Sequence, residues 1–147
     1  MTEFKRVFVD TAPIIYYLEN SSLYMDAIKK FFTKCIEENI QIVTSAITIE
    51  EYLVFPYSNG KMEFADNFKK FIEYMNIDVV DINSEIAEQG AKIRGQYKKF
   101  KAMDALQIAT AIVSGCDMFF TNDKQLRQEK ELPCMTMEDL EKYLWKH

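Results

Sequence analysis

The residues best suited to chemistry are four carboxylates, each placed beside a predicted strand or near the start of a predicted helix: Asp10, Glu51, Asp104 and Asp123. Carboxylates that lie close together repel one another, so without a cation at least one of them would take up a proton. A hard divalent ion removes this conflict, and Mg²⁺ usually binds one or two carboxylates together with a substrate phosphate. Such a site suits phosphodiester hydrolysis, because the metal activates water and stabilises the leaving oxygen.

Most other catalytic chemistry is excluded by the composition. The only histidine is His147, the last residue of the sequence, so Ser-His-Asp triads, Cys-His pairs and histidine-ligated metals are not expected. The glycines, at positions 60, 90, 95 and 115, form neither of the glycine-rich phosphate-binding motifs. Cys35, Cys116 and Cys134 are isolated along the chain, which argues against a zinc site and a disulfide framework.

Each acid also has a purely structural explanation. The run Thr48-Ile49-Glu50-Glu51 matches a capping box, in which Glu51 would satisfy backbone donors. Asp10 and Asp123 are plausible caps for the turns that follow them, and Asp104 would stabilise the positive end of its own helix. Four independent caps have no reason to converge, however, so a common location would favour a functional site.

The pattern along the chain alternates between strands and helices. Strands are predicted at Arg6–Val9, Ile40–Val43, Ile77–Ile82, Asp117–Phe120 and, more briefly, Pro133–Met135. Helices are predicted from about Pro13 and through Tyr24–Ile36, Ile47–Phe55, Phe64–Met75, Ile86–Tyr97, Met103–Ser114 and Met137–Trp145. Pro56 is expected to end the third of these helices. The alternation favours a three-layer α/β/α fold with a central parallel sheet, in which ligands bind at the carboxyl ends of the strands.

Length and composition predict one domain spanning residues 1–147. With 147 residues and 48% hydrophobic side chains, the chain can bury a sizeable core without a metal or disulfide staple. No apolar stretch approaches the ~18 residues of a membrane span, and no signal peptide is recognisable. We therefore expect a cytoplasmic protein with no membrane association. The formal charge of −5 argues against a protein that coats nucleic acid without sequence preference, but not against a nuclease whose carboxylates surround a metal ion.

Four motifs contain the acids: Val9-Asp10-Thr11, Thr44-Ser45-x-Ile47-Thr48-x-x-Glu51, Asp104-Ala105-Leu106-Gln107-Ile108-Ala109-Thr110-Ala111 and Phe120-Thr121-Asn122-Asp123. In order and spacing, over essentially the whole chain, the sequence resembles the PIN-domain ribonucleases, especially the small VapC-type toxins of toxin–antitoxin pairs. The resemblance implies a PIN-like fold and a Mg²⁺- or Mn²⁺-dependent endoribonuclease that leaves 5′-phosphate and 3′-hydroxyl ends. It also implies that the four acids are both catalytic and metal-binding. A homodimer and a cognate antitoxin protein that blocks the site are further implications.

Neighbouring residues are candidates for supporting roles. Candidates to orient carboxylates or water are Thr11, Thr121 and Asn122, although ordinary turns and caps explain them equally well. Candidates to bind RNA phosphates are Lys98, Lys99 and Lys101, for which a solvated helix face is an equal alternative. Glu50 is an alternative to Glu51 as the site acid. Only the spacing from Ser45 and Thr48 favours Glu51 over Glu50.

Three functions are compatible with these patterns. The leading hypothesis is the metal-dependent endoribonuclease acting as a toxin. A non-catalytic PIN-like module that binds RNA or protein is the alternative, and the presence of all four acids counts against it. A phosphoryl-accepting receiver-like domain ranks last, because Asp10 has no acidic neighbour at its turn.

Overall fold

A computed structural model describes residues 4–20 and 23–146, without the side chains of residues 143–146. Its centre is a five-stranded sheet in the order β3-β2-β1-β4-β5, and every neighbouring pair of strands is parallel. The strands are β1 (Arg6–Val9), β2 (Gln41–Ser45), β3 (Asp78–Val80), β4 (Met118–Thr121) and β5 (Cys134–Thr136). The prediction of a central parallel sheet is confirmed.

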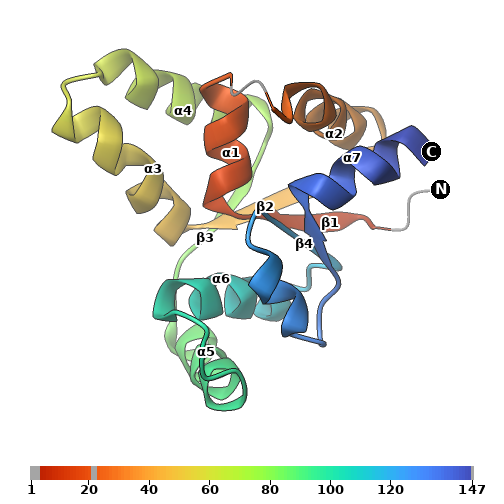
Figure 1. The fold of residues 1–147 in the computed structure, drawn as a ribbon. Helices are drawn as coiled ribbons and strands as arrows, with labels where there is room; N and C mark the ends of the chain where they lie inside the picture. The colour runs from red at the N-terminus through yellow and green to blue at the C-terminus, as the bar shows by residue number, and fades with distance from the viewer. Residues whose placement is uncertain (1–3, 21–22, 147) are drawn as a thin grey trace.

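Helices cover both faces of the sheet (Figure 1). One face carries α1 (Thr11–Leu18), α2 (Met25–Glu37), α3 (Ala46–Ser58), α4 (Met62–Tyr74) and α7 (Met137–Lys146). The other face carries α5 (Ser84–Gln96) and α6 (Ala102–Val113), and a short 3₁₀ helix, η1 (Lys124–Gln128), follows β4. This is the expected three-layer α/β/α arrangement.

Two hydrophobic cores hold the layers together, one on each face of the sheet. Successive strand residues point to opposite faces, so β1 sends Val7 and Val9 into one core and Phe8 into the other. Phe8 stacks on Phe119 of β4, with ring centroids 5.3 Å apart. The central strands are therefore apolar on both sides, as expected for a covered parallel sheet.

Three local predictions were wrong. Helix α3 continues past Pro56 to Ser58, although Pro56 has no N–H to donate to the carbonyl one turn earlier, so that the helix lacks one hydrogen bond there. The predicted capping box at Thr48 does not form, since α3 begins at Ala46 and Ser45 is its cap, with its hydroxyl accepting from the N–H of Ile47. Strand β3 is also shorter than predicted, covering Asp78–Val80.

Two sequence-based predictions concern membrane spans and histidine chemistry. Among the described helices, none is both long and apolar enough to cross a membrane. His147, on which the exclusion of histidine chemistry depended, lies outside the described residues.

The strand order creates a crevice at the centre of the sheet. From β1 the chain leads outward to β2 and β3 on one side, and later to β4 and β5 on the other. In parallel sheets the carboxyl ends of the strands on either side of such a reversal border the ligand site. Asp10 directly follows β1, and its backbone N–H donates to the carbonyl of Phe120 in β4 at 2.9 Å. The topology therefore brings the ends of β1 and β4 together at one place.

Candidate active site

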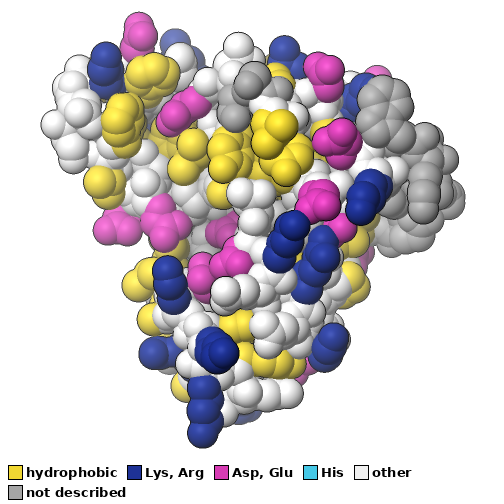
Figure 2. All heavy atoms as spheres, in the orientation of Figure 1, with side chains coloured by type: hydrophobic (Ala, Val, Ile, Leu, Met, Phe, Trp, Pro, Cys, Tyr) yellow, Lys and Arg dark blue, Asp and Glu magenta, His cyan; other side chains and the backbone are white. Residues whose placement is uncertain are grey.

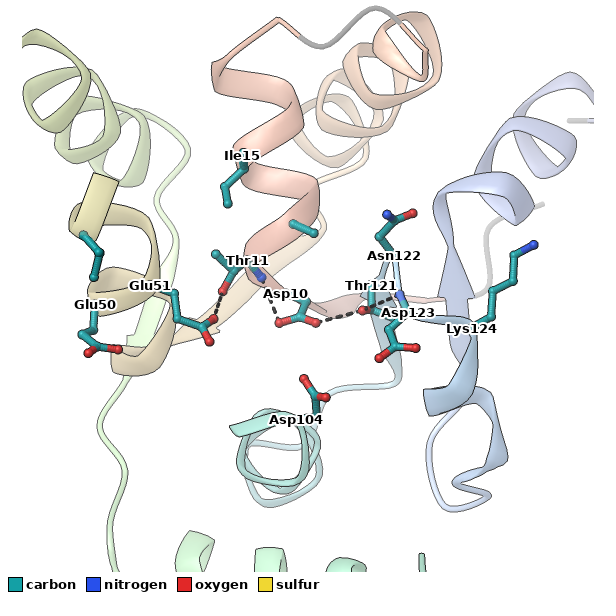
Figure 3. A pocket seen from close by; sticks show the side chains of 12 residues that line it. Asp10, Thr11, Ile15, Glu50, Glu51, Asp104, Thr121, Asn122, Asp123 and Lys124 are labelled. Carbon is teal, nitrogen blue, oxygen red and sulfur yellow. Dashed lines mark hydrogen bonds between the residues drawn. The ribbon is translucent and has the colours of Figure 1, made fainter. Parts of the chain in front are cut away.

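A pocket of about 710 Å³ opens at the carboxyl ends of β1 and β4. All four predicted acids line it: Asp10, Glu51, Asp104 and Asp123. They come from four different parts of the chain, the end of β1, helix α3, the start of α6 and the segment after β4 (Figure 3). The four acids therefore converge on one pocket, which would not be expected if each were only an independent helix cap.

Asp10 is the most firmly held of these carboxylates. Its Oδ1 accepts from the backbone N–H of Thr11 at 2.9 Å and from Nε2 of Gln107 at 3.2 Å. Its Oδ2 accepts from the hydroxyl of Thr121 at 2.8 Å. Burial raises the pKa of Asp10 above its ordinary value, although these three hydrogen bonds oppose the shift by stabilising the ionised form.

Asp104 lies in the first turn of α6, across the pocket from Asp10 (Figure 3). The pKa of this carboxyl is raised from 3.8 to about 6. Burial is the largest cause, the negative charges of the other three acids add to it, and the charge of Lys101 opposes them. No described residue donates a hydrogen bond to the Asp104 carboxylate, so its charge is stabilised by little besides solvent and the start of α6.

Glu51, rather than Glu50, points toward Asp10 (Figure 3). Its Oε1 accepts from the hydroxyl of Thr11 at 2.6 Å. Partial burial is the main cause that raises the pKa of Glu51, and the charges of Asp10 and Glu50 add to it. Glu50 also lines the pocket, but its side chain turns away from the other acids. The geometry thus favours Glu51 as the site acid.

The segment after β4 supplies the fourth acid and two polar neighbours. Asp123 caps η1, with Oδ1 accepting from the N–H of Gln125 at 3.0 Å. Thr121 both donates to Asp10 and accepts from the backbone N–H of Asp123 at 3.2 Å, so it links the two acids. Asn122 lines the pocket and donates to the hydroxyl of Tyr16 at a long 3.4 Å. Thr11 and Thr121 therefore both contact site carboxylates, whereas Asn122 contacts none of them directly.

The predicted basic residues lie beside the pocket rather than in it. Lys98, Lys99 and Lys101 are exposed, and none of them lines the pocket. Lys124 is the cation that does so, and its ammonium pairs with Glu138 of α7 at 2.6 Å. Binding of RNA phosphates by the three predicted lysines therefore stays a prediction, and Lys124 is an addition that the sequence pattern did not indicate.

A buried polar network beneath Asp10 was also missed. Its members are Thr44 and Ser45 at the end of β2, Thr48 in α3 and Gln107 in α6. Thr48 had a local explanation as part of a capping box, which concealed its long-range contacts. The available signal was Gln107, because a long amide inside an otherwise apolar helix must find hydrogen-bond partners if it is buried.

The chemistry of these side chains fits a hard cation, but not a site formed by protein ligands alone. Within residues 4–20 and 23–146, no group of three or more His, Cys, Asp or Glu side chains is arranged to hold a metal ion. Mg²⁺ commonly binds through one or two carboxylates, with water and substrate phosphate completing its shell. The crowded carboxylates are compatible with such an open site, and the pKa values of Asp10, Glu51 and Asp104 are raised.

Solved structures with the same fold were found by comparison of the coordinates. VapBC2 from Rickettsia felis, bound to a DNA fragment from its promoter, shares 14% identity, covering 89% of this chain and 98% of that chain at a TM-score of 0.74. VapBC-1 from nontypeable Haemophilus influenzae shares 18% identity, covering 90% and 98% at a TM-score of 0.71. Mycobacterium tuberculosis VapC20, described as a sarcin–ricin loop cleaving toxin, shares 16% identity, covering 77% and 86% at a TM-score of 0.59. These likenesses establish the fold.

Sequence comparison gives the family. A search of the curated proteins finds no match to the chain. The sequence model described as "PIN domain" matches residues 7–131, a range that includes all four site acids. Together with the parallel sheet and the acidic pocket at its carboxyl edge, this match shows that the chain belongs to the PIN domain family.

Proposed function

We propose that this protein is a Mg²⁺- or Mn²⁺-dependent endoribonuclease and the toxin of a toxin–antitoxin pair. The observation that carries the proposal is the convergence of four carboxylates, from four separate segments, in one pocket. Membership of the PIN domain family supports it. The fold shared with a toxin described as cleaving the sarcin–ricin loop supports RNA as the substrate.

The metal would be held by Asp10 and its acidic neighbours Glu51, Asp104 and Asp123. When bound, a divalent ion activates water for attack on the phosphodiester and neutralises the charge that develops on the phosphate oxygens. Asp10 lies at the centre of the group, and its three hydrogen bonds hold it in one orientation. Asp104, which accepts no hydrogen bond from the described residues, remains available to orient a water molecule or to accept its proton.

The walls of the pocket differ in character. Ala12, Ile15 and Val54 contribute apolar side chains to the lining, and the carboxylates and Lys124 contribute charged ones. The apolar side chains offer a contact surface for a nucleobase. Lys124 adds a positive charge to the lining, although its ammonium is paired with Glu138 of α7.

An antitoxin protein is the proposed partner. Hydrophobic side chains gather on the surface above the acidic hollow, over α1 and along α3 (Figure 2). On α3, Val54, which lines the pocket, is about half exposed, as are Phe55 and Tyr57. Such a patch beside a cluster of carboxylates fits an apolar segment that also carries a basic side chain. The VapBC complexes that share this fold support a partner of the antitoxin kind.

Homodimerisation and a cytoplasmic location complete the proposal. The homodimer comes from the resemblance to VapC-type toxins, and the cytoplasmic location comes from the composition of the sequence. Light scattering of the purified protein would test the first, because a homodimer has twice the mass of the 17.3 kDa chain. A short upstream gene whose product abolishes growth arrest by this protein would test the antitoxin pairing.

The decisive test is cleavage of RNA by the purified protein in the presence of Mn²⁺ or Mg²⁺. Asp10→Asn is expected to abolish cleavage while the protein remains folded. Asp66→Asn is the matched control, because Asp66 is an exposed aspartate on α4, away from the pocket. Equal cleavage by wild type and Asp10→Asn would refute the proposed function, as would chelator-resistant cleavage by all three proteins.

A further inference from the structure

Gln107 is a buried amide directly beneath the acidic pocket. It lies on the apolar helix α6 and is only 1% exposed. Its Nε2 is 3.2 Å from Oδ1 of Asp10 and 2.9 Å from Oγ1 of Thr48, and its Oε1 accepts from the hydroxyl of Ser45. Both N–H groups and the carbonyl are therefore in use, and the partners come from two separate segments, Asp10 after β1 and Ser45 and Thr48 at the start of α3.

The direction of this amide is fixed by its partners. An ionised carboxylate can only accept, so the amide nitrogen must face Asp10. The Ser45 oxygen accepts from the backbone N–H of Ile47 at 3.1 Å, and its hydroxyl donates to the Gln107 carbonyl. Turning the amide over would place a carbonyl against Asp10 and an N–H₂ group against Ser45. The network therefore holds one orientation.

This orientation determines which oxygen of Asp10 stays available. A carboxylate offers about four lone-pair positions, two on each oxygen. Oδ1 uses both of its positions, for the backbone N–H of Thr11 and for Gln107. Oδ2 uses one, for the hydroxyl of Thr121. A single lone pair, on Oδ2, remains.

We propose that Gln107 is a positioning residue that saturates Oδ1 of Asp10, so that Asp10 presents only Oδ2 to a divalent cation in the pocket. Through Thr48 and Ser45, Gln107 also fixes Asp10 relative to the start of α3, the helix that carries Glu51. The inference rests on the proposed metal-dependent function and adds to it a role for a residue outside the acidic group.

The test measures Mn²⁺ binding by the full-length protein without RNA, using calorimetry. Gln107→Met keeps the length of the side chain and removes its hydrogen bonds. Loss of a group that orients a metal ligand typically weakens metal affinity by about 10–100-fold, and we expect this range. Thr110→Val is the matched control, because Thr110 is buried on the same helix and donates to the carbonyl of Leu106 at 2.7 Å, not to Asp10. It should leave the Mn²⁺ affinity unchanged.

A second variant covers the case in which Gln107→Met does not fold. Thr48→Val removes an acceptor of the amide but retains Gln107, so it should loosen the amide and weaken Mn²⁺ binding by a smaller factor. Wild-type affinity in whichever of these variants folds would overturn the inference while leaving the metal site intact. Absence of Mn²⁺ binding by wild type and by Asp10→Asn alike would overturn the proposed function itself.

Discussion

Asp104→Asn should abolish metal-dependent RNA cleavage and, in the absence of metal, should make the protein more stable. The substitution keeps the size and shape of the side chain but removes a charge that is crowded by three other carboxylates. A residue that was present only to stabilise the start of α6 would show the opposite behaviour, since replacing it would cost stability. The sign of the stability change therefore separates the two explanations of this acid.

The size of the effect follows from the pKa of Asp104. Burial and neighbouring charges raise this pKa from 3.8 to about 6, which corresponds to an upper limit of about 3 kcal/mol. The side chain is partly exposed, so screening by solvent reduces the cost of its charge to about 1–2 kcal/mol. Loss of the favourable interaction with the helix start removes about 0.5 kcal/mol of the gain. The net stabilisation is about 1 kcal/mol, which raises Tm by about 2–4 °C.

The pH dependence gives an independent check. Because the pKa of Asp104 is higher in the folded than in the unfolded state, its ionisation destabilises the fold as the pH rises from 3.8 to about 6. The stabilisation by Asn should therefore be complete at about pH 7.5 and fall below about a third of that value at about pH 4. Denaturant unfolding with chelator present measures it, and Asp66→Asn should change stability by less than about 0.5 kcal/mol at either pH. A destabilised Asp104→Asn protein at about pH 7.5, or a gain independent of pH, would refute the reasoning.

Three further predictions use simpler measurements. Mn²⁺ at about 100 times its Kd should stabilise the wild type by roughly 2.7 kcal/mol, raising Tm by several degrees, and Asp10→Asn should lose most of this shift; identical melting curves for both proteins would exclude a preformed metal site. Neutralising Lys98, Lys99 and Lys101 together should reduce the slope of log K for RNA binding against log salt concentration by about one unit per lost phosphate contact. An unchanged slope would mean that these lysines are solvated surface residues that do not bind RNA. Asp10→Ala should cost about 1 kcal/mol through loss of the cap of α1, a cost that Asp10→Asn should avoid because asparagine also caps helices; equal stability of the two variants would contradict the capping role.

The sequence predicted the architecture well because its apolar patterns are local. The range Arg6–Val9 was predicted as a strand and is β1, since a short β-rich run ending in an acid leaves little choice of boundaries. Pro56 misled the prediction because α3 tolerates the loss of one hydrogen bond there and continues for two more residues. The short helix η1 carries no strong apolar period, so the sequence between Asp123 and β5 gave no signal for it.

The pocket was predictable in part, for a physical reason. Strand topology alone brings Asp10 and Asp123 together, because parallel strands end at the same edge of the sheet. The contacts of Gln107 depend on how α6 rotates about its own axis against β1 and α3, which a hydrophobic pattern leaves undefined. A buried amide indicates that hydrogen-bond partners exist, but only the packed structure identifies them as Asp10, Thr48 and Ser45.

Capping and catalysis are compatible roles for these acids, because a carboxylate has two oxygens. Asp10 caps α1 through Oδ1 and keeps a lone pair on Oδ2, and Asp123 caps η1 through Oδ1. Each cap fixes the carboxylate to the first turn of a helix and so defines where its second oxygen lies. Asp104 has no such bond among the described residues, and burial together with the neighbouring negative charges raises its pKa to about 6. Hydrogen bonds thus orient two of the acids at the crevice, whereas the charge of the third is poorly stabilised. This combination is expected of a site that binds a cation and a phosphate.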